Sequence, residues 1–268
     1  MDIINLLPED KYNVVDDFLT FISIYDDQNR TKAYFDLLEA HKSQIKNKIC
    51  VELGTGLGLL AEKMAQMGAK RVYAVEVNPL LFNLANRRLS KYENVTVILA
   101  DAREFIPPEP VDTLVQEFYG QMLYDEELYI LERLKWQPKL VLPDGGKLLA
   151  GLTKVELFDD PVVNLDVIKQ LENVLVSGLF DEQGLELKLE ISRFKYGSKF
   201  KRSVTYTLPE TEDNLLYFGL EITHEGQTVC RAGVCDNWSY VWTYKAGRRF
   251  NLRFVRGERA PEVKFRWL

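Results

Sequence analysis

The hydrophobic pattern of this chain changes near residue 139, and that change limits the folds it can adopt more than any other feature. Before residue 139, helical spacing of apolar residues alternates with short β-rich runs. Strand, helix and strand in that order form a unit with parallel strands, so the repetition predicts a doubly wound α/β sheet. The expected strands are residues 48–53, 71–77, 95–101 and 111–118, and the expected helices are residues 59–70, 78–92 and 126–136.

After residue 139, apolar and polar residues alternate with a period of two, and only residues 161–180 look helical. Short strands separated by Gly, Asp or Pro predict an antiparallel sandwich or barrel packed after the α/β domain. We therefore expect N-terminal helices and a Rossmann-like domain over residues 1–143, and a β-barrel-like domain over residues 144–268. The strands expected in the second domain are residues 148–158, 185–194, 203–209, 215–226, 240–246, 250–257 and 263–268.

Composition narrows the class of partner. The 268 residues are 46% apolar and carry a formal net charge of −6. This charge disfavours a broad phosphate-binding surface and suits a cationic substrate better, so we expect no nucleic-acid partner. No apolar run reaches the roughly 18 residues of a membrane span, and the N-terminus MDIINLLPEDKY lacks the pattern of a secretory signal. We expect a cytoplasmic protein with no membrane partner.

The cysteines and histidines do not form a metal-binding pattern. Cys50 lies in the apolar run ICVELG, which predicts a buried thiol. Cys230 and Cys235 have no second close cysteine pair, and His41 and His224 stand alone in the sequence. The spacing therefore favours no metal site.

A glycine turn follows the first expected strand. In VELGTGLG, Gly54, Gly56 and Gly58 lie between a strand and a helix, where glycine lets the backbone approach a ligand and the helix start offers N–H groups. The dinucleotide fingerprint G-x-G-x-x-G would need a glycine where Leu59 stands. The observed spacing, with an acidic residue two before Gly54, resembles the first motif of S-adenosylmethionine (SAM) methyltransferases.

Three acidic residues follow or end successive expected strands. Ligands of such sheets bind beyond the carboxyl ends of the strands, so Glu52, Glu76 and Asp101 are candidates for one site. Glu52 would meet the methionine amino group, Glu76 would accept both ribose hydroxyls, and Asp101 would reach the adenine amine. The alternative is that the glycines only make a tight turn and the acids only solvate strand ends.

The stretch QEFYGQMLYDEEL places Glu117 and Glu126 around an aromatic-lined loop. Two carboxylates in one pocket repel unless a cation lies between them, and a guanidinium has the planar donors to fill that place. Two carboxylates would also fix the direction of a nitrogen that attacks SAM. The alternative is a strand end, a turn at Gly120 and an acidic helix start, and Asp125 and Glu127 are interpreted as such helix-start charges.

This stretch resembles the double-E loop of the protein arginine methyltransferases, E-W-M-G-Y-x-L-x-x-E, with Gly120 and Leu123 also in register. DDQNRTKAY is similar to the family segment D-x-x-R-T-x-x-Y. Residues 46–76 resemble the first motifs, and residues 134–149 resemble D-K-W-L-x-P-x-G-x-x-x-P-D with two residues fewer. The resemblance covers about residues 26–150 and implies a divergent or minimal member.

The resemblance implies a SAM-dependent methyltransferase domain followed by a β-barrel, acting on arginine in a protein or peptide or on a small guanidine. It implies that Glu117 and Glu126 clamp the guanidinium and that Arg30 pairs with the SAM carboxylate. The residues expected to hold SAM are Arg30, Glu52, Gly54, Gly56, Gly58, Glu76 and Asp101.

The sequence also departs from the family. Asp236-Asn237-Trp238 replaces the threonine-histidine-tryptophan loop, and we expect Asn237 and Trp238, with Tyr119, to line the substrate pocket. The N-terminal tyrosine motif is unclear, because the matching positions are Lys11 and Val15. A homodimer is possible, although only residues 161–180 could replace the family's dimerisation arm. Two other functions stay open: methylation of a non-guanidine small molecule, and SAM binding by an interaction protein with little activity.

Overall fold

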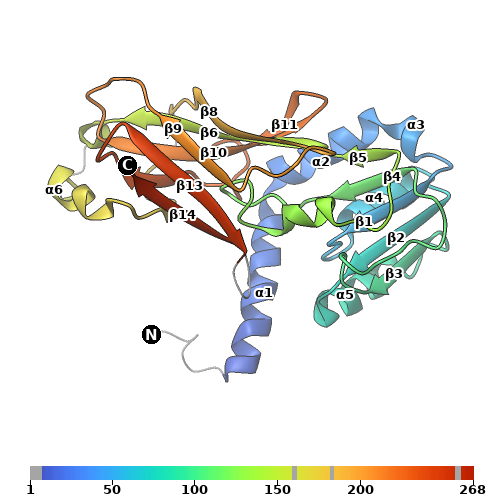
Figure 1. Ribbon diagram of the computed structural model, residues 1–268. Coiled ribbons are helices and arrows are strands. Elements are labelled where there is room, and N and C mark those ends of the chain that lie inside the picture. Colours follow the sequence, from blue (N-terminus) through green and yellow to red (C-terminus); the bar gives the residue numbers. More distant parts are fainter. Residues whose placement is uncertain (1–7, 159–161, 182–183, 257–260) are drawn as a thin grey trace. The chain divides into compact units, whose positions relative to one another are not determined.

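The computed structural model describes residues 8–158, 162–181, 184–256 and 261–268 (Figure 1). The chain divides into two compact units. The first comprises the chain up to Glu117 together with Leu134–Leu142, and the second comprises Phe118–Arg133 and Pro143–Leu268. The segment Phe118–Arg133 therefore belongs with the strand-rich half, whereas a single boundary after residue 143 would place it with the α/β half. Each unit is described by itself.

The first unit contains a five-stranded parallel sheet with the order β3-β2-β1-β4-β5, which confirms the expected α/β fold (Figure 1). The two central strands β1 and β4 are buried along their whole length, as their continuous apolar runs predict. The strands are β1 (Ile49–Leu53), β2 (Arg71–Glu76), β3 (Val95–Leu99), β4 (Thr113–Gln116) and β5 (Leu140–Leu142).

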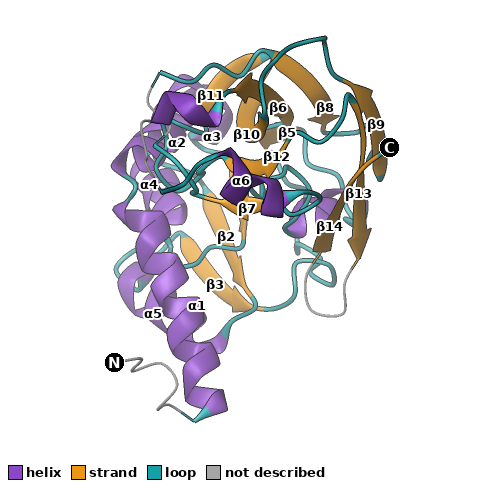
Figure 2. Ribbon diagram, turned by 90° about the vertical axis from the view of Figure 1, so that its left-hand side faces the viewer, coloured by secondary structure: helices purple, strands orange, loops and turns teal. Residues whose placement is uncertain are grey.

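Helices connect these strands and precede them. Helix α4 contacts β2, and α5 contacts β2 and β3 (Figure 2). Helix α5 begins where the Asn78 side chain accepts the N–H groups of Leu80 and Leu81, and Pro79 occupies its first turn. The helices are α1 (Glu9–Asp26), α2 (Gln28–Ala40), α3 (Lys42–Ile45), α4 (Leu59–Gln66) and α5 (Pro79–Leu89).

The strand register brings the ends of neighbouring strands to one edge of the sheet. Leu53 pairs with Val75 of β2 and with Gln116 of β4. Glu76 pairs with Leu99 of β3. The same edge of the sheet therefore carries the glycine turn, Glu76 and Glu117, which follows Gln116. Parallel α/β sheets bind ligands at this edge.

The second unit contains two antiparallel sheets, as the period-two pattern predicts. Phe218 on β10 lies edge-on to Phe250 on β13 and Phe265 on β14, so aromatic rings fill the space between the sheets. One sheet contains β6 (Gly145–Thr153), β7 (Val176–Ser177), β8 (Leu189–Lys195), β10 (Leu215–His224), β11 (Gln227–Arg231) and β12 (Val241–Tyr244). The other contains β9 (Ser203–Thr207), β13 (Arg249–Arg256) and β14 (Pro261–Trp267).

Several expected elements differ from the observed ones. The strand expected over residues 148–158 ends at Thr153, and the 3-10 helix η3 (Val155–Phe158) follows. The helix expected over residues 161–180 is reduced, in its described part, to α6 (Leu165–Ile168), η4 (Lys169–Leu171) and β7 (Figure 2). Its apolar residues have helical spacing, but several stay exposed, so little apolar burial stabilises a longer helix.

Two further differences are local. The helix expected over residues 126–136 is the 3-10 helix η2 (Glu127–Glu132). Strand β11 was not expected, because residues 227–231 alternate weakly; the positive φ angles of Glu225 and Gly226 turn the chain back onto β10. No helix in the described ranges is long and apolar enough to cross a membrane.

Candidate functional site

The glycine turn of the first unit adopts a backbone conformation that favours glycine. Gly54, Gly56 and Gly58 have φ angles of 72°, 53° and 81°. A Cβ atom at Gly56 would lie 2.8 Å from the Phe21 ring and 2.8 Å from the Tyr25 hydroxyl. The turn therefore needs glycine both for its backbone angles and for the close approach of α1.

Phe21 and Tyr25 of α1 lie over this turn, and the sequence did not single them out. The Tyr25 hydroxyl accepts the N–H of Leu57 at 3.0 Å and donates to the Thr55 carbonyl at 3.4 Å. Burial and the nearby Glu52 raise the pKa of Tyr25 to about 12, so it stays a donor. The two rings are four residues apart on one helical face, a spacing that could have revealed them.

Glu52 is buried at the end of β1. Its Oε2 accepts the N–H of Ala61 at 2.9 Å and the hydroxyl of Thr55. Burial raises the pKa of Glu52 to about 8. The carboxyl group thus ties the glycine turn to the first turn of α4, which is a structural task beside its predicted role toward the methionine amino group.

Glu76 presents its carboxylate at the same edge. Its Oε2 accepts the N–H of Gly56 at 2.8 Å, and its Oε1 accepts the N–H groups of Val77 and Asn78 at 2.9 and 2.8 Å. Burial raises the pKa of this carboxyl group. Three of about four acceptor directions are used by the backbone, so one remains on Oε2 for a ribose hydroxyl. Glu76 can accept both ribose hydroxyls only if one of its three backbone N–H donors is released.

Asp101 lies just beyond the end of β3 and forms an ion pair with Arg103. The Arg103 Nε lies 2.9 Å from both carboxylate oxygens, and the Arg103 backbone N–H donates to Oδ1 at 2.8 Å. Hydrogen bonds from Arg103 hold the pKa of Asp101 below its usual value. The carboxylate is therefore charged and fixed in direction, and an adenine amine would share it with Arg103.

Arg30 and Glu117 form an ion pair within the first unit. The Arg30 side chain is 9% exposed and that of Glu117 is 18% exposed. Asp27 begins helix α2 by accepting the Arg30 backbone N–H at 2.8 Å, and the guanidinium also donates to the Ile24 carbonyl at 3.3 Å. Glu117, the first residue after β4, thus binds a guanidinium beside the glycine turn.

The loop after Glu117 belongs to the second unit. Asp125 accepts the N–H of Met122 at 2.8 Å, and a Cβ atom at Gly120 would lie 2.1 Å from the Asp125 carboxylate. Burial raises the pKa of Asp125 to about 6. The helix-start interpretation of Asp125 is therefore incomplete, because this carboxylate closes the loop rather than facing solvent.

The remaining loop residues occupy different environments. Glu126 is exposed and directly precedes η2, so it begins a 3-10 helix and not the α-helix expected. Tyr119 is fully buried in the second unit, where its ring lies 6.5 Å from that of Phe194 and its hydroxyl donates to the Pro143 carbonyl at 3.4 Å. Glu117 and Glu126 lie in different units.

Asn237 and Trp238 follow a disulfide between Cys230 and Cys235. The sequence did not predict this bond. Both cysteines are buried, and the N–H of Trp238 donates to the Cys235 carbonyl at 3.2 Å. Trp238 is buried and Asn237 is half-buried, so the bridge constrains the start of the loop that carries both residues.

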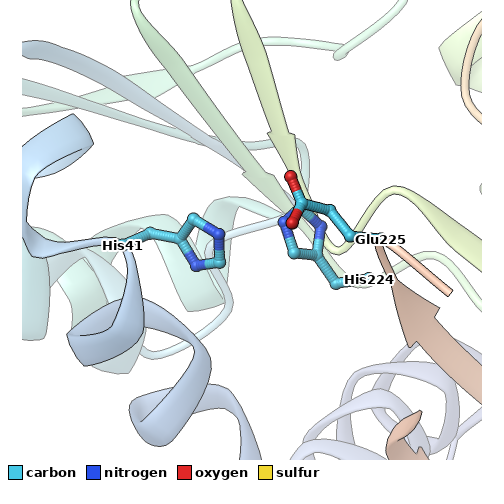
Figure 3. Close-up of side chains that lie close together, drawn as sticks. All are labelled: His41, His224 and Glu225. Carbon is cyan, nitrogen blue, oxygen red and sulfur yellow. The ribbon is translucent and has the colours of Figure 1, made fainter. Parts of the chain in front are cut away.

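Figure 3 shows His41, His224 and Glu225. The Nδ1 of His41 lies 2.9 Å from the Leu37 carbonyl at the end of α2, in the first unit. His224 ends β10 in the second unit, with its Nδ1 3.6 Å from Asp144. Because these residues come from two units, whose relative position is not determined, the group supports no metal site.

Comparisons with known proteins found a family model, curated relatives and solved structures that resemble this chain. Residues 24–131 match the model of a family described as ribosomal RNA adenine dimethylase. The chain is 34% identical over 117 residues to protein arginine N-methyltransferase PRMT10 of Arabidopsis thaliana, which covers 41% of this chain and 30% of that protein. It is 32% identical over 154 residues to protein arginine N-methyltransferase 1 of Oryza sativa subsp. indica, which covers 54% of this chain and 38% of that protein. The chain thus matches less than half of the length of these curated relatives.

Solved structures share the fold over nearly the whole chain. The structure of Arabidopsis thaliana protein arginine methyltransferase 10 has a TM-score of 0.67 at 15% identity, with 91% of this chain and 90% of that chain covered. The Trypanosoma brucei PRMT1 enzyme-prozyme complex with AdoHcy has a TM-score of 0.68 at 13% identity, with 92% and 98% covered. At these identities the likeness shows the fold, an α/β domain with antiparallel sheets.

Proposed function

We propose that this chain, which resembles protein arginine methyltransferases in sequence and in fold, is an enzyme that transfers a methyl group from SAM to a guanidinium nitrogen of arginine. The acceptor would be an arginine of a protein or peptide, or a small guanidine. Glu117, the carboxylate that follows β4 at the ligand-binding edge of the sheet, carries the proposal because it binds a guanidinium, that of Arg30.

The residues at this edge fit the parts of SAM. The positive φ angles of the glycine turn let a ligand approach the backbone, and Glu76 keeps an acceptor direction for a ribose hydroxyl. Asp101 would accept from the adenine amine, and Arg30 would bind the methionine carboxylate. SAM would supply a methyl group on a positively charged sulfur.

Glu117 and Glu126 would act on the acceptor. Each carboxylate would accept N–H groups of the guanidinium, which draws positive charge away from the third nitrogen and fixes its direction. A nitrogen becomes more acidic as it is alkylated, so its proton can leave late and no strong base is needed. Tyr119, Asn237 and Trp238 are proposed to line the pocket, and buried Tyr119 would do so by fixing the loop.

The pair between Arg30 and Glu117 gives the site an order of events. A guanidinium substrate at Glu117 competes with Arg30, and a carboxylate at Arg30 competes with Glu117. Binding of the SAM carboxylate by Arg30 would therefore release Glu117 for the substrate. Splitting a buried pair without these replacements is costly, so both ligands would be needed for the exchange.

Methyl transfer from labelled SAM into fractionated cell extract tests the proposal. We expect label in polypeptides and methylarginine after acid hydrolysis. Glu117→Gln should lower turnover roughly tenfold or more while SAM binding, measured by calorimetry, persists. Glu127→Gln, which changes the neighbour of Glu126, is the matched control and should leave turnover unchanged. Full activity of Glu117→Gln on arginine would exclude the clamp.

The same assay separates the alternatives. Label in a small-molecule fraction without methylarginine would indicate a non-guanidine acceptor, and SAM binding without transfer would indicate an interaction protein. Label in RNA would indicate the activity named by the family model that matches residues 24–131.

The absence of a nucleic-acid partner, the homodimer and the cytoplasmic location stay predictions. The buried disulfide between Cys230 and Cys235 disfavours the predicted cytoplasmic location, because disulfide bonds persist mainly in oxidising compartments.

A further inference from the structure

A pocket of about 240 Å³ lies in the second unit, outside the residues assigned to methyl transfer. It forms where η2 and the residue after it meet the segment before β9, strand β13 and the first residue of β14. Its charged lining comprises Arg133, Lys201, Arg202, Arg253 and Glu132. Among the residues with described positions, four cations and one carboxylate give the pocket a positive character within a chain of net charge −6.

Aromatic rings make the pocket a built cavity. Tyr124 is buried, and its ring centroid lies 5.0 Å from that of Phe200 and 5.0 Å from that of Phe254. The N–H of Phe254 donates to the Arg202 carbonyl at 2.9 Å, which joins the segment before β9 to β13. The packed rings and the strand pairing therefore position the backbone that carries these cations.

The charges of this pocket are not balanced from within the described ranges. Glu132 accepts the N–H of Phe200 at 2.7 Å, and the Arg133 guanidinium lies 5.4 Å from the centre of the Tyr129 ring. Among the residues with described positions, no carboxylate lies within 4.0 Å of the side-chain nitrogens of the four cations. Converging cations without carboxylate partners favour an anionic ligand.

We propose that this pocket binds an anionic side chain, a carboxylate or a phosphate, of the polypeptide that the enzyme methylates. The inference rests on the proposed function and adds a preference for substrates that carry acidic or phosphorylated residues near the arginine. A planar guanidinium and an ammonium can bind two oxygens of such a group, and the aromatic floor excludes water from one side.

Helix η2 sets the distance along the substrate. It begins directly after Glu126 and ends at Glu132 in the pocket lining. A 3-10 helix rises about 2 Å per residue, so these residues lie roughly 12 Å apart along it. An extended peptide rises about 3.3 Å per residue. The anionic residue is therefore expected roughly four positions from the methylated arginine.

Matched peptides test this pocket. One peptide carries arginine with two phosphoserines at the expected spacing, and the other carries serines there. We expect the KM of the phosphorylated peptide to be about tenfold lower, with kcat unchanged. Arg253→Gln and Lys201→Gln should each remove most of this difference. Arg249→Gln is the control, because it removes the same charge from the same strand outside the pocket.

A binding experiment separates this proposal from the proposed function. A phosphoserine peptide without arginine is titrated into the protein by calorimetry, so methyl transfer is not needed for a signal. We expect binding that Arg253→Gln weakens about tenfold and Arg249→Gln does not. Equal weakening by both variants would indicate general surface charge and overturn the proposal. Inorganic phosphate that binds as tightly as the peptide would overturn it in favour of a small anion.

Discussion

The two glutamates of the candidate clamp differ in what positions them. Glu117 directly follows a fully buried strand of a parallel sheet, and Arg30 binds its carboxylate. Glu126 is exposed and begins a short 3-10 helix in the second unit. The sheet register fixes the position of Glu117. A loop closed by Asp125 and Gly120 fixes the position of Glu126.

This difference reflects the two kinds of sheet. In a parallel sheet every strand ends at the same edge, so residues far apart in sequence reach one site. In an antiparallel sheet successive strands end at opposite edges, so a site there depends on loops. Substitutions of buried carboxylates, glycines and helix caps can be compared between the two units. Their effects on the free energy of unfolding show how far the parallel-sheet unit and the antiparallel-sheet unit differ.

The largest expected effect is on the pH dependence of stability. Burial raises the pKa of Glu52 to about 8 from 4.5, so the folded state holds this proton more tightly than the unfolded state. The contribution to the free energy of unfolding is fully present below pH 4.5 and is lost as the pH rises toward 8. The loss amounts to a few kcal/mol, at about 1.4 kcal/mol per pKa unit. Glu52→Gln should remove it in denaturant unfolding at pH 5, 6.5 and 8.

Asp125→Asn provides the comparison from the second unit. Burial raises the pKa of Asp125 from 3.8 to about 6, so the sign is the same and the affected window is lower and narrower. The variant should flatten the profile only between these values. A pH profile of Glu52→Gln that parallels the unmodified protein above pH 6 would show that the Glu52 carboxyl is not held in the way described.

A smaller effect is expected from two glycines. Gly56→Ala places a Cβ at a φ of 53° and 2.8 Å from the Phe21 ring, whereas Gly120→Ala places one 2.1 Å from the Asp125 carboxylate. Each should cost roughly 2 to 3 kcal/mol of unfolding free energy, the first mainly through the backbone and the second through crowding. Gly247→Ala is the control, because its Cβ would meet Trp267 at 3.5 Å, an ordinary contact.

SAM binding separates these glycine variants. Calorimetry should show that Gly56→Ala weakens SAM binding, because this residue lies in the predicted SAM turn. Gly120→Ala should leave SAM binding intact and lower turnover through displacement of the loop before Glu126. Equal weakening of SAM binding by Gly120→Ala and Gly56→Ala would contradict the proposal that the sheet edge binds SAM and that the loop before Glu126 acts only on turnover.

Sequence patterns predicted four of the five strands of the first unit for a physical reason, whereas the three-residue strand β5 was not expected. Continuous apolar runs mark buried parallel strands, and Asn78 with Pro79 marks the start of α5. The positions of Glu76 and Asp101 then follow from where strands end. The sequence could not show that Arg30 would pair with Glu117, because that contact joins residues 87 positions apart (117 − 30) through the tertiary fold.

The second unit was less predictable. Alternating residues indicated strands but not where they end, so η3 and β11 were missed. Helical spacing in residues 161–180 did not produce a long helix, because that stretch buries few apolar residues. The disulfide between Cys230 and Cys235 depends on the turn after β11, where the N–H of Cys235 donates to the Arg231 carbonyl at 3.0 Å, and spacing alone does not determine such a pair.

Asparagine caps offer the smallest and most direct comparison. Asn78 begins the eleven-residue α5 and accepts N–H groups at 2.9 and 3.3 Å, while Asn164 begins the four-residue α6 and accepts at 3.1 and 3.3 Å. Asn78→Ala should cost about 1 kcal/mol of unfolding free energy and Asn164→Ala about half of that, because α6 is exposed and short. Chemical denaturation of both variants checks this order. Equal costs would mean that α6 stabilises the second unit as much as α5 stabilises the first.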